Sequence, residues 1–383
     1  MNISSTILSG YQVLEDVNYL IDKTQKVLLV TDKNIVSLPV AAKFIRHIQQ
    51  IAQDVTIIND VPPEPSNHDV EALLSRLPHQ DFDLVIGLGG GSVLDVTKLL
   101  SVLAIQGSSA NLQQLLSGEK PVKRCRSILV PTTAGTGSEA TPNAILAIPE
   151  KNTKVGIISA VLLPDYVFLV PELTTSMPAH IAASTGIDAL CHLIECFTSN
   201  IANPVSDNYA LTGLAKLLVN IETVVKQPEN LAARLEMLWA SYYGGAAIAH
   251  SGTHLVHAMS YPLGGKYHIP HGVANAILLA PCMRFIQKVA SEKLAVVYAL
   301  LPTADLSLTD EQKAEALVDY FYSLVNGLGL PTTLNQLNIP DSDLPYLVDA
   351  ALNVQRLMKM FHAQSAVRML RLFTNLFIKK LIN

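Results

Sequence analysis

Cysteine and long apolar runs are scarce in this chain, and each scarcity excludes a class of protein. Four cysteines in 383 residues, with no Cys-x-x-Cys spacing, exclude a disulfide framework and a cysteine-based zinc motif. No run of about 18 uncharged apolar residues occurs, so the sequence predicts no membrane-spanning helix. The first residues contain neither a basic segment nor a long apolar segment. We therefore expect no secretory signal and a cytoplasmic protein.

Positive charge is also sparse, because 27 Lys and Arg residues stand against 32 Asp and Glu residues, a net charge of −5. A mildly acidic chain without a basic block is a poor candidate for binding nucleic acid. Hydrophobic residues, in contrast, make up 49% of the chain and charged residues only 15%. Such a chain can bury a large core, and its length predicts two domains at roughly 100–200 residues each.

The first part of the chain alternates β-rich runs with helical periodicity. We predict strands at residues 26–31, 54–58, 83–88 and 127–131, and helices at 36–51, 69–77 and 93–105, with further extended segments at 144–148, 155–158 and 167–170. Short apolar strands separated by helices predict a parallel sheet that is covered on both faces.

Helical patterns dominate after Pro171, and Pro178 lies where a first helix would begin. We predict helices at residues 179–199, 204–225, 230–250, 310–328 and 344–360. The simplest division is an α/β domain at 1–177 and an all-α domain at 178–383. Residues 354–383 contain six basic side chains and no acidic one. We expect a final helix packed by its apolar face there, with a membrane-surface or docking helix as the alternative.

Two polar loops follow predicted strands. Residues 87–92, Gly-Leu-Gly-Gly-Gly-Ser, open a predicted helix, where glycines allow close approach of a ligand and free N–H groups favour a phosphate. Residues 131–139 contain four hydroxyl side chains at the sheet edge where open α/β folds bind ligands. A tight turn and an ordinary Thr/Ser loop are the alternatives, but two such loops at neighbouring strand ends favour a nucleotide.

Asp32 lies at the end of the first predicted strand, residues 26–31. A carboxylate at this place can accept hydrogen bonds from ribose hydroxyls and would repel a 2′-phosphate. The cap of a following helix is the alternative role.

Asp188 and His192 have the spacing of metal ligands, since positions i and i+4 project from the same face of a helix. His257 and His271 follow further along the chain. One carboxylate and three imidazoles suit Fe²⁺ or Zn²⁺ and would bind Ca²⁺ poorly. Spacing alone does not choose among five histidines in this region, which are His250, His254, His257, His268 and His271.

Three neighbours of this pair have more ordinary interpretations. Cys191 and Cys196 lie on helical positions rotated away from Asp188 and His192, so we expect buried apolar residues. Glu195 is either a partner that orients a metal ligand or a solvated or capping residue.

No Gly-x-Ser-x-Gly motif occurs, which argues against a serine hydrolase of the common α/β type.

Taken together, these motifs resemble the iron-containing (group III) alcohol dehydrogenases in order and spacing over residues 5–355. The resembling stretches are GLGGGSVLDVTK (87–98), PTTAGTGSEAT (131–141), TGIDALCHLIE (185–195) and VHAMSYPLGGKYHIPHGVANAILL (256–279). The resemblance implies a dehydroquinate synthase-like fold. In that fold, an α/β NAD-binding domain with a parallel sheet precedes an all-α metal-binding domain, and the active site lies in the cleft between them.

The resemblance also implies a set of site residues. The implied metal ligands are Asp188, His192, His257 and His271. The implied cofactor contacts are Asp32, Gly89, Gly90, Gly91, Ser92, Asp95, Thr132, Thr133, Thr136, Asn143 and Lys154. The implied reaction is reversible hydride transfer between NAD(H) and a small alcohol or its carbonyl partner, in a homodimer or larger homo-oligomer. Fe²⁺, or else Zn²⁺, would lower the pKa of the alcohol.

The sequence departs from the family pattern at Tyr261, where many relatives carry a histidine linked to proton relay. Tyr261 and His268 are the candidates to replace it. Alternative functions are the reduction of an acidic carbonyl, such as a semialdehyde acid, and metal and nucleotide binding without turnover. Lyase chemistry of the dehydroquinate synthase kind would require a basic cluster for phosphorylated sugar acids, and the sequence contains none.

Overall fold

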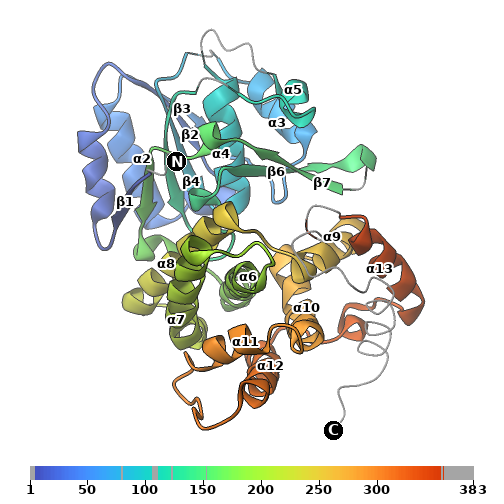
Figure 1. Ribbon diagram of the computed structural model, residues 1–383. Helices are drawn as coiled ribbons and strands as arrows, with labels where there is room; N and C mark the ends of the chain where they lie inside the picture. The colour runs from blue at the N-terminus through green and yellow to red at the C-terminus, as the bar shows by residue number, and fades with distance from the viewer. Residues whose placement is uncertain are drawn as a thin grey trace. The chain divides into compact units, whose positions relative to one another are not determined.

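The computed structural model describes residues 5–78, 81–105, 111–121, 124–151, 153–354 and 357. The chain divides into two compact units, one of Met1–Met177 with Pro228–Gly245 and one of Pro178–Gln227 with Ala246–Asn383. One boundary falls between Met177 and Pro178, where the sequence changes from mixed to helical patterns. Figure 1 labels the helices and strands.

The first unit contains a parallel sheet, as the sequence predicts, and its six strands lie in the order β1-β8-β5-β4-β2-β3. Its strands are β1 (Thr6–Ser9), β2 (Lys26–Val30), β3 (Asp54–Ile58), β4 (Leu84–Gly89), β5 (Arg126–Pro131) and β8 (Tyr166–Leu169). The predicted extended segments at 144–148 and 155–158 form a separate antiparallel hairpin, β6 (Asn143–Ile148) with β7 (Thr153–Ile158). The sheet register places Gly89 of β4 opposite Pro131 of β5.

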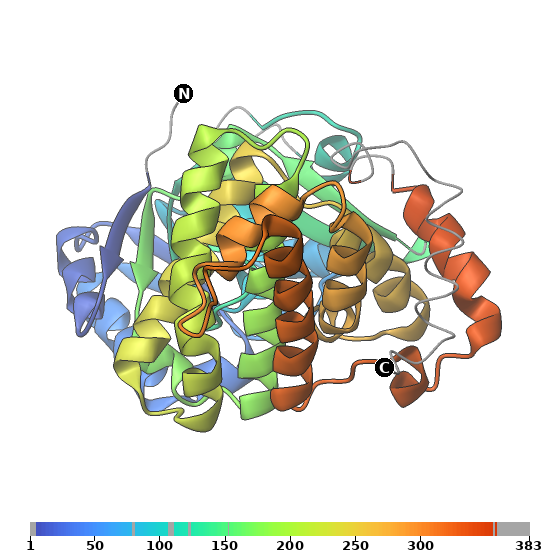
Figure 2. The ribbon, with the colours of Figure 1, turned by 60° about the horizontal axis from the view of Figure 1, so that its bottom comes forward.

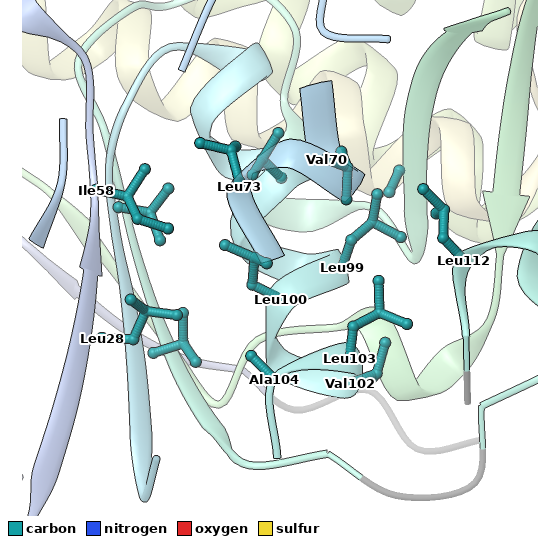
Figure 3. Close-up of a cluster of buried hydrophobic side chains, with 14 of the residues drawn as sticks. Leu28, Ile58, Val70, Leu73, Leu99, Leu100, Val102, Leu103, Ala104 and Leu112 are labelled. Atoms are coloured by element: carbon teal, nitrogen blue, oxygen red, sulfur yellow. The ribbon is translucent and has the colours of Figure 1, made fainter. Parts of the chain in front are cut away.

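Helices cover both faces of this sheet (Figure 1). They are α1 (Lys33–Val36), α2 (Pro39–Ile51), α3 (Asn67–Ser75), α4 (Gly91–Leu103) and α5 (Leu112–Leu116). Alternate residues of β2 point to opposite faces, so Leu28 packs in the cluster with α3 and α4 that Figure 3 shows, while Leu29 packs with α2.

The predicted helix at 36–51 is interrupted. α1 ends at Val36 and α2 begins at Pro39. Proline disfavours helical geometry in the residue before it and has no N–H to donate, but it is well tolerated at the first position of a helix. The proline therefore begins a second helix.

The second unit is helical throughout its described residues. Its helices are α6 (Ala179–Thr198), α7 (Pro204–Lys226), α9 (Leu255–Tyr267), α10 (His271–Ile286), α11 (Ser291–Tyr298), α12 (Asp310–Gly327) and α13 (Leu344–Leu352). α6 packs against α7 and α10, and α13 lies along α9, as Figures 1 and 2 show. α13 is shorter than the predicted helix at 344–360, and most of the basic segment 354–383 lies outside the described residues. No helix in the described ranges is long and apolar enough to cross a membrane.

α8 (Leu231–His250) begins in the segment that groups with the first unit. It carries the only tryptophan of the sequence, Trp239, whose ring stacks on Tyr243 at 5.4 Å and meets Tyr242 edge-on at 5.7 Å. A side chain at Gly245 would bring a Cβ within 2.1 Å of the carbonyl oxygen of Gly137. Only glycine therefore permits this contact between α8 and the loop after β5.

Candidate active site

Four candidate metal ligands converge in the second unit. Asp188 and His192 lie one turn apart on α6, His257 lies on α9, and His271 is the first residue of α10. One ligand atom from each lies within 4.8 Å of all the others. The Asp188 Oδ1 atom is 3.5 Å from Nε2 of His271 and 3.6 Å from Nε2 of both His192 and His257. Donor atoms about 2.1 Å from one tetrahedral ion are about 3.4 Å apart, so these spacings fit ligands around a single cation.

Local structure explains how three helices reach one point. α9 ends at Tyr267, and the residue that caps it, His268, adopts a left-handed conformation with φ 54°. α10 begins at His271, three residues after His268. Gly272, in the first turn of α10, packs on α6, since a Cβ there would lie 2.3 Å from the carbonyl oxygen of Ser184. A side chain at Gly272 would therefore require a shift at the residue next to His271.

Charges at this site favour a cation. Burial alone would raise the pKa of Asp188, but the imidazoles of His192, His271 and His257 outweigh it and hold the pKa well below its usual range. Burial would lower the pKa of His257, yet the carboxylates of Glu195 and Asp188 raise it to about 9. A buried carboxylate and a strongly basic imidazole are groups that a divalent metal ion can neutralise or coordinate.

Glu195 is a buried partner of His257, the first of its two expected roles. Nδ1 of His257 donates to Glu195 Oε2, and the backbone N–H of Val256 donates to Oε1 at 2.6 Å. His254 lies on the other side, with Nδ1 3.3 Å from Glu195 Oε1 and Nε2 2.9 Å from Thr198 Oγ1. His254 therefore adjoins the centre through Glu195 without joining the four donors, a contact that sequence spacing does not reveal.

Asn275 is a member of the site that the sequence analysis missed. Its Nδ2 atom lies 2.7 Å from Asp188 Oδ1, 3.3 Å from His271 Nε2 and 3.4 Å from His257 Nε2. Its position is i+4 from His271 on α10, the same spacing that joins Asp188 and His192 on α6. This i, i+4 spacing is the sequence feature from which the proximity of Asn275 to His271 could have been predicted.

Of the other residues considered in the sequence analysis, Tyr261 lies near a candidate metal ligand. The ring of Tyr261 lies 6.4 Å from that of His271, whereas His268 is exposed at the end of α9. His250 stacks on Tyr209, with ring centroids 5.9 Å apart. Cys191 and Cys196 are buried as predicted, and burial raises the pKa of Cys196 to about 12.

The two polar loops of the first unit lie side by side, as neighbouring strands require. The backbone N–H of Thr132 donates to the carbonyl oxygen of Gly89 at 3.0 Å. α4 begins at Gly91 without a side-chain cap, so its first N–H groups have no side-chain acceptor there. A Cβ on Gly91 would lie 2.7 Å from Thr136 Oγ1, which shows how closely the loops approach. The Thr132 hydroxyl is buried and has no hydrogen-bond partner among the described residues, as suits a group that a bound ligand completes.

Asp95 and Lys98 form part of a buried network beside these loops. Asp95 accepts hydrogen bonds from the Ser138 hydroxyl and, at 2.9 Å, from the backbone N–H of Ile145. Nζ of Lys98 lies 3.1 Å from Asp95 Oδ1 and donates to the carbonyl oxygens of Ser138 and Asn143. The network therefore holds the loop after β5 against α4.

Three other predicted cofactor residues, Asp32, Ser92 and Lys154, have partners within the protein. Asp32 caps α1, since its side chain accepts from the N–H groups of Asn34 and Ile35, which is the alternative role considered for it. Lys154 forms an ion pair with Glu64 at 2.9 Å. The Ser92 hydroxyl accepts from the backbone N–H of Glu64 at 3.1 Å. The ion pair of Lys154 with Glu64 therefore lies beside the glycine turn.

Comparison with known proteins agrees with this geometry. Residues 4–171 match the family described as iron-containing alcohol dehydrogenase, and residues 182–377 match the C-terminal part of the Fe-containing alcohol dehydrogenase family. The long-chain-alcohol dehydrogenase 1 of Geobacillus thermodenitrificans is 34% identical over 334 residues, which are 87% of this chain and 84% of the relative.

Solved structures show the same fold. The structure of a 1,3-propanediol oxidoreductase has a TM-score of 0.88 and 30% identity, covering 96% of this chain and 97% of that one. A sulfoacetaldehyde reductase from Bifidobacterium kashiwanohense, solved in complex with NAD⁺, has a TM-score of 0.85 and 25% identity over 99% and 98% of the two chains. Fold, family and relatives agree on an NAD-dependent oxidoreductase that interconverts alcohols and carbonyl compounds. The chain belongs to the iron-containing alcohol dehydrogenase family.

Proposed function

We propose that this protein transfers hydride reversibly between NAD(H) and a small primary or secondary alcohol, with Fe²⁺ as its metal and Zn²⁺ as the alternative ion. The convergence of one carboxylate and three imidazole nitrogens within 4.8 Å is the observation that carries the proposal. A metal at these residues would supply Lewis acidity, which lowers the pKa of an alcohol and polarises a carbonyl group.

The chain's own residues prepare this centre for a cation. Asp188 contributes a buried negative charge, and Glu195 accepts from Nδ1 of His257, which turns its Nε2 toward Asp188. Tyr261 is our first candidate for proton transfer because its ring lies close to that of His271, and exposed His268 is the second. In this proposal residues 178–383 form the metal-binding and catalytic domain.

NAD(H) would bind to the α/β domain, residues 1–177, and supply or accept the hydride. The open first turn of α4 at Gly89, Gly90, Gly91 and Ser92 suits a pyrophosphate. The buried Thr132 hydroxyl supports a contact from the next loop. The further contacts in this proposal are Asp32, Asp95, Thr133, Thr136, Asn143 and Lys154.

Asp32 provides a separate test of the choice between NAD and NADP. Asp32→Asn keeps an oxygen that can cap α1 and removes the charge that would repel a 2′-phosphate. We expect the ratio of kcat/KM for NAD over NADP to fall at least about tenfold, a change of about 1.4 kcal/mol. An unchanged ratio with unchanged stability would remove Asp32 from the ribose site.

We also propose a homodimer or larger homo-oligomer in the cytoplasm. β1 is an edge strand, since β8 is its only strand partner among the described residues, and a free edge can accept a further strand.

The decisive experiment measures absorbance at the NADH band. Anaerobic protein loaded with Fe²⁺ is mixed with NAD or NADP and a panel of short alcohols, diols and hydroxy acids. Reduction of NAD that EDTA abolishes is the expected result. NADH binding without turnover of any panel member would contradict the proposed substrate class, and absence of NADH binding would contradict the nucleotide site.

The reduction of an acidic carbonyl is the second candidate, favoured by the similarity to the sulfoacetaldehyde reductase. The same assay in reverse, with NADH and anionic aldehydes beside neutral ones, separates the two. Turnover restricted to anionic aldehydes would replace the first proposal with the second.

A further inference from the structure

The carboxamide of Asn275 lies among the donors of the candidate metal centre. The side chain is completely buried on α10, and its nitrogen is 2.7 Å from Asp188 Oδ1. The same nitrogen lies 3.3 Å and 3.4 Å from Nε2 of His271 and His257, respectively. One amide group thus touches three of the four candidate ligands.

Chemistry determines which end of the amide faces the donors. An ionised Asp188 can only accept hydrogen bonds, so the NH₂ group and not the carbonyl oxygen must face it. The same nitrogen lies within 3.4 Å of Nε2 of His257 and His271, so the end of the amide that faces Asp188 also lies beside both imidazoles. The amide therefore faces the atoms that would bind a metal.

The other end of the amide makes the arrangement costly. Oδ1 of Asn275 is buried without a hydrogen-bond partner among the described residues. A buried acceptor without a partner loses stability that an apolar side chain of similar size would not lose. The unpartnered oxygen therefore offsets part of the stability that the contact with Asp188 provides.

We propose that Asn275 is a positioning residue of the metal centre. Its NH₂ group donates to Asp188 and fixes that carboxylate beside His257 and His271, in the arrangement that receives the ion. The inference rests on the metal-dependent function proposed above, and it adds a residue that donates to the ligands without being one of them.

Asn275→Leu separates positioning from stability, because it removes the NH₂ group and the unpartnered oxygen at similar volume. We expect the affinity for Zn²⁺ and Co²⁺, measured against a chromophoric chelator, to fall about 10- to 100-fold. We expect the melting temperature in EDTA to stay within a few degrees of the wild type, because the lost contact with Asp188 and the removal of the unpartnered oxygen offset each other. The visible absorption of bound Co²⁺ should change. Wild-type metal affinity, or a loss of affinity matched by a loss of metal-free stability, would overturn the proposal.

Asn220→Leu is the matched control. Asn220 also lies on a helix, but its amide donates to the carbonyl oxygen of Lys216 at 2.8 Å, in the same helix. Its substitution should leave metal affinity unchanged.

Asn275→Asp tests the contact itself if the leucine variant does not fold. It would place a carboxylate against Asp188, so the metal-free protein should melt several degrees below the wild type and regain stability with metal. Equal metal-free stability would mean that the NH₂ group does not face Asp188. A wild-type protein that binds no divalent metal would contradict the proposed function, whereas equal binding by wild type and Asn275→Leu would contradict only the role of Asn275.

Discussion

Each unit of this protein buries a cluster of polar groups, and the two clusters differ in where the positive charge comes from. In the first unit, Lys98 is fully buried and its ammonium group is surrounded by the oxygens of Asp95, Ser138, Thr141 and Asn143. In the second unit, Asp188 lies among three imidazoles, and these imidazoles supply the positive charge that lowers its pKa.

The difference separates a structural cluster from a ligand site. Oxygens around a side-chain ammonium are satisfied within the fold, so the Lys98 cluster fastens α4 to the loop after β5. The second cluster consists of one carboxylate and three imidazoles, all of them side chains that can coordinate a metal ion. A buried convergence of side chains that can all coordinate a metal ion is therefore the stronger sign of function.

The largest expected effect is on the Lys98 cluster. Lys98→Met would leave the carbonyl oxygens and Asp95 without their cation, and removing one partner of a buried pair costs about 3–5 kcal/mol. We expect a matching fall in the free energy of unfolding that added metal does not restore. Lys226→Met, which removes an exposed pair with Glu222, should cost under about 1 kcal/mol. Rescue of Lys98→Met by Zn²⁺ would break the distinction between the clusters.

An intermediate effect is expected at the second cluster. His271→Ala removes one of four donors, so affinity for Zn²⁺ should fall at least about 100-fold, or about 2.7 kcal/mol. His268→Ala, three residues earlier and exposed, should bind as the wild type does. Metal content after dialysis and chelator competition both measure this. Equal loss in the two variants would mean that His271 is not a ligand.

The smallest expected effect is a pH dependence of the free energy of unfolding, which arises from the first cluster. Burial raises the pKa of Glu139, beside Lys98, to about 7, whereas the imidazoles lower that of Asp188. Because the pKa of Glu139 is higher in the folded protein than in the unfolded chain, the folded protein loses this proton at a higher pH. Stability should therefore fall as pH rises from about 4.5 to about 7, by on the order of 1–3 kcal/mol.

Glu139→Gln should remove that part of the pH dependence. Urea unfolding followed by circular dichroism at pH 5 and pH 8 measures it, with exposed Glu222→Gln as the control. An identical pH slope in Glu139→Gln and wild type would show that Glu139 is ionised in the folded protein throughout.

Periodicity predicted most of the fold because it reflects local geometry. The strand at residues 54–58 and the helices beginning at Ala179, Pro204 and Asp310 agree closely with the structure. The pairing of β6 with β7 was not predicted, since alternation in a strand does not name its partner. The break at Pro39 follows from proline chemistry, which the apolar spacing of residues 36–51 concealed.

In the candidate site too, contacts within one helix could be predicted from the sequence, whereas contacts between helices could not. The i, i+4 spacing of Asp188 and His192 predicted their proximity, because both lie on one helix. The choice of His257 and His271 among five histidines came from family resemblance, since contacts between helices are not encoded in local spacing. The contact of His254 with Glu195 joins residues 59 positions apart and required the fold.

The stacked ring of Trp239 has a consequence for observing this protein in solution. All intrinsic tryptophan emission comes from this one side chain, which belongs to the segment Pro228–Gly245 of the first unit. The visible colour of bound Co²⁺ would arise only from the second. Two optical signals thus report on the two units separately, and a single denaturant titration followed in both would reveal whether they unfold in one step or in two.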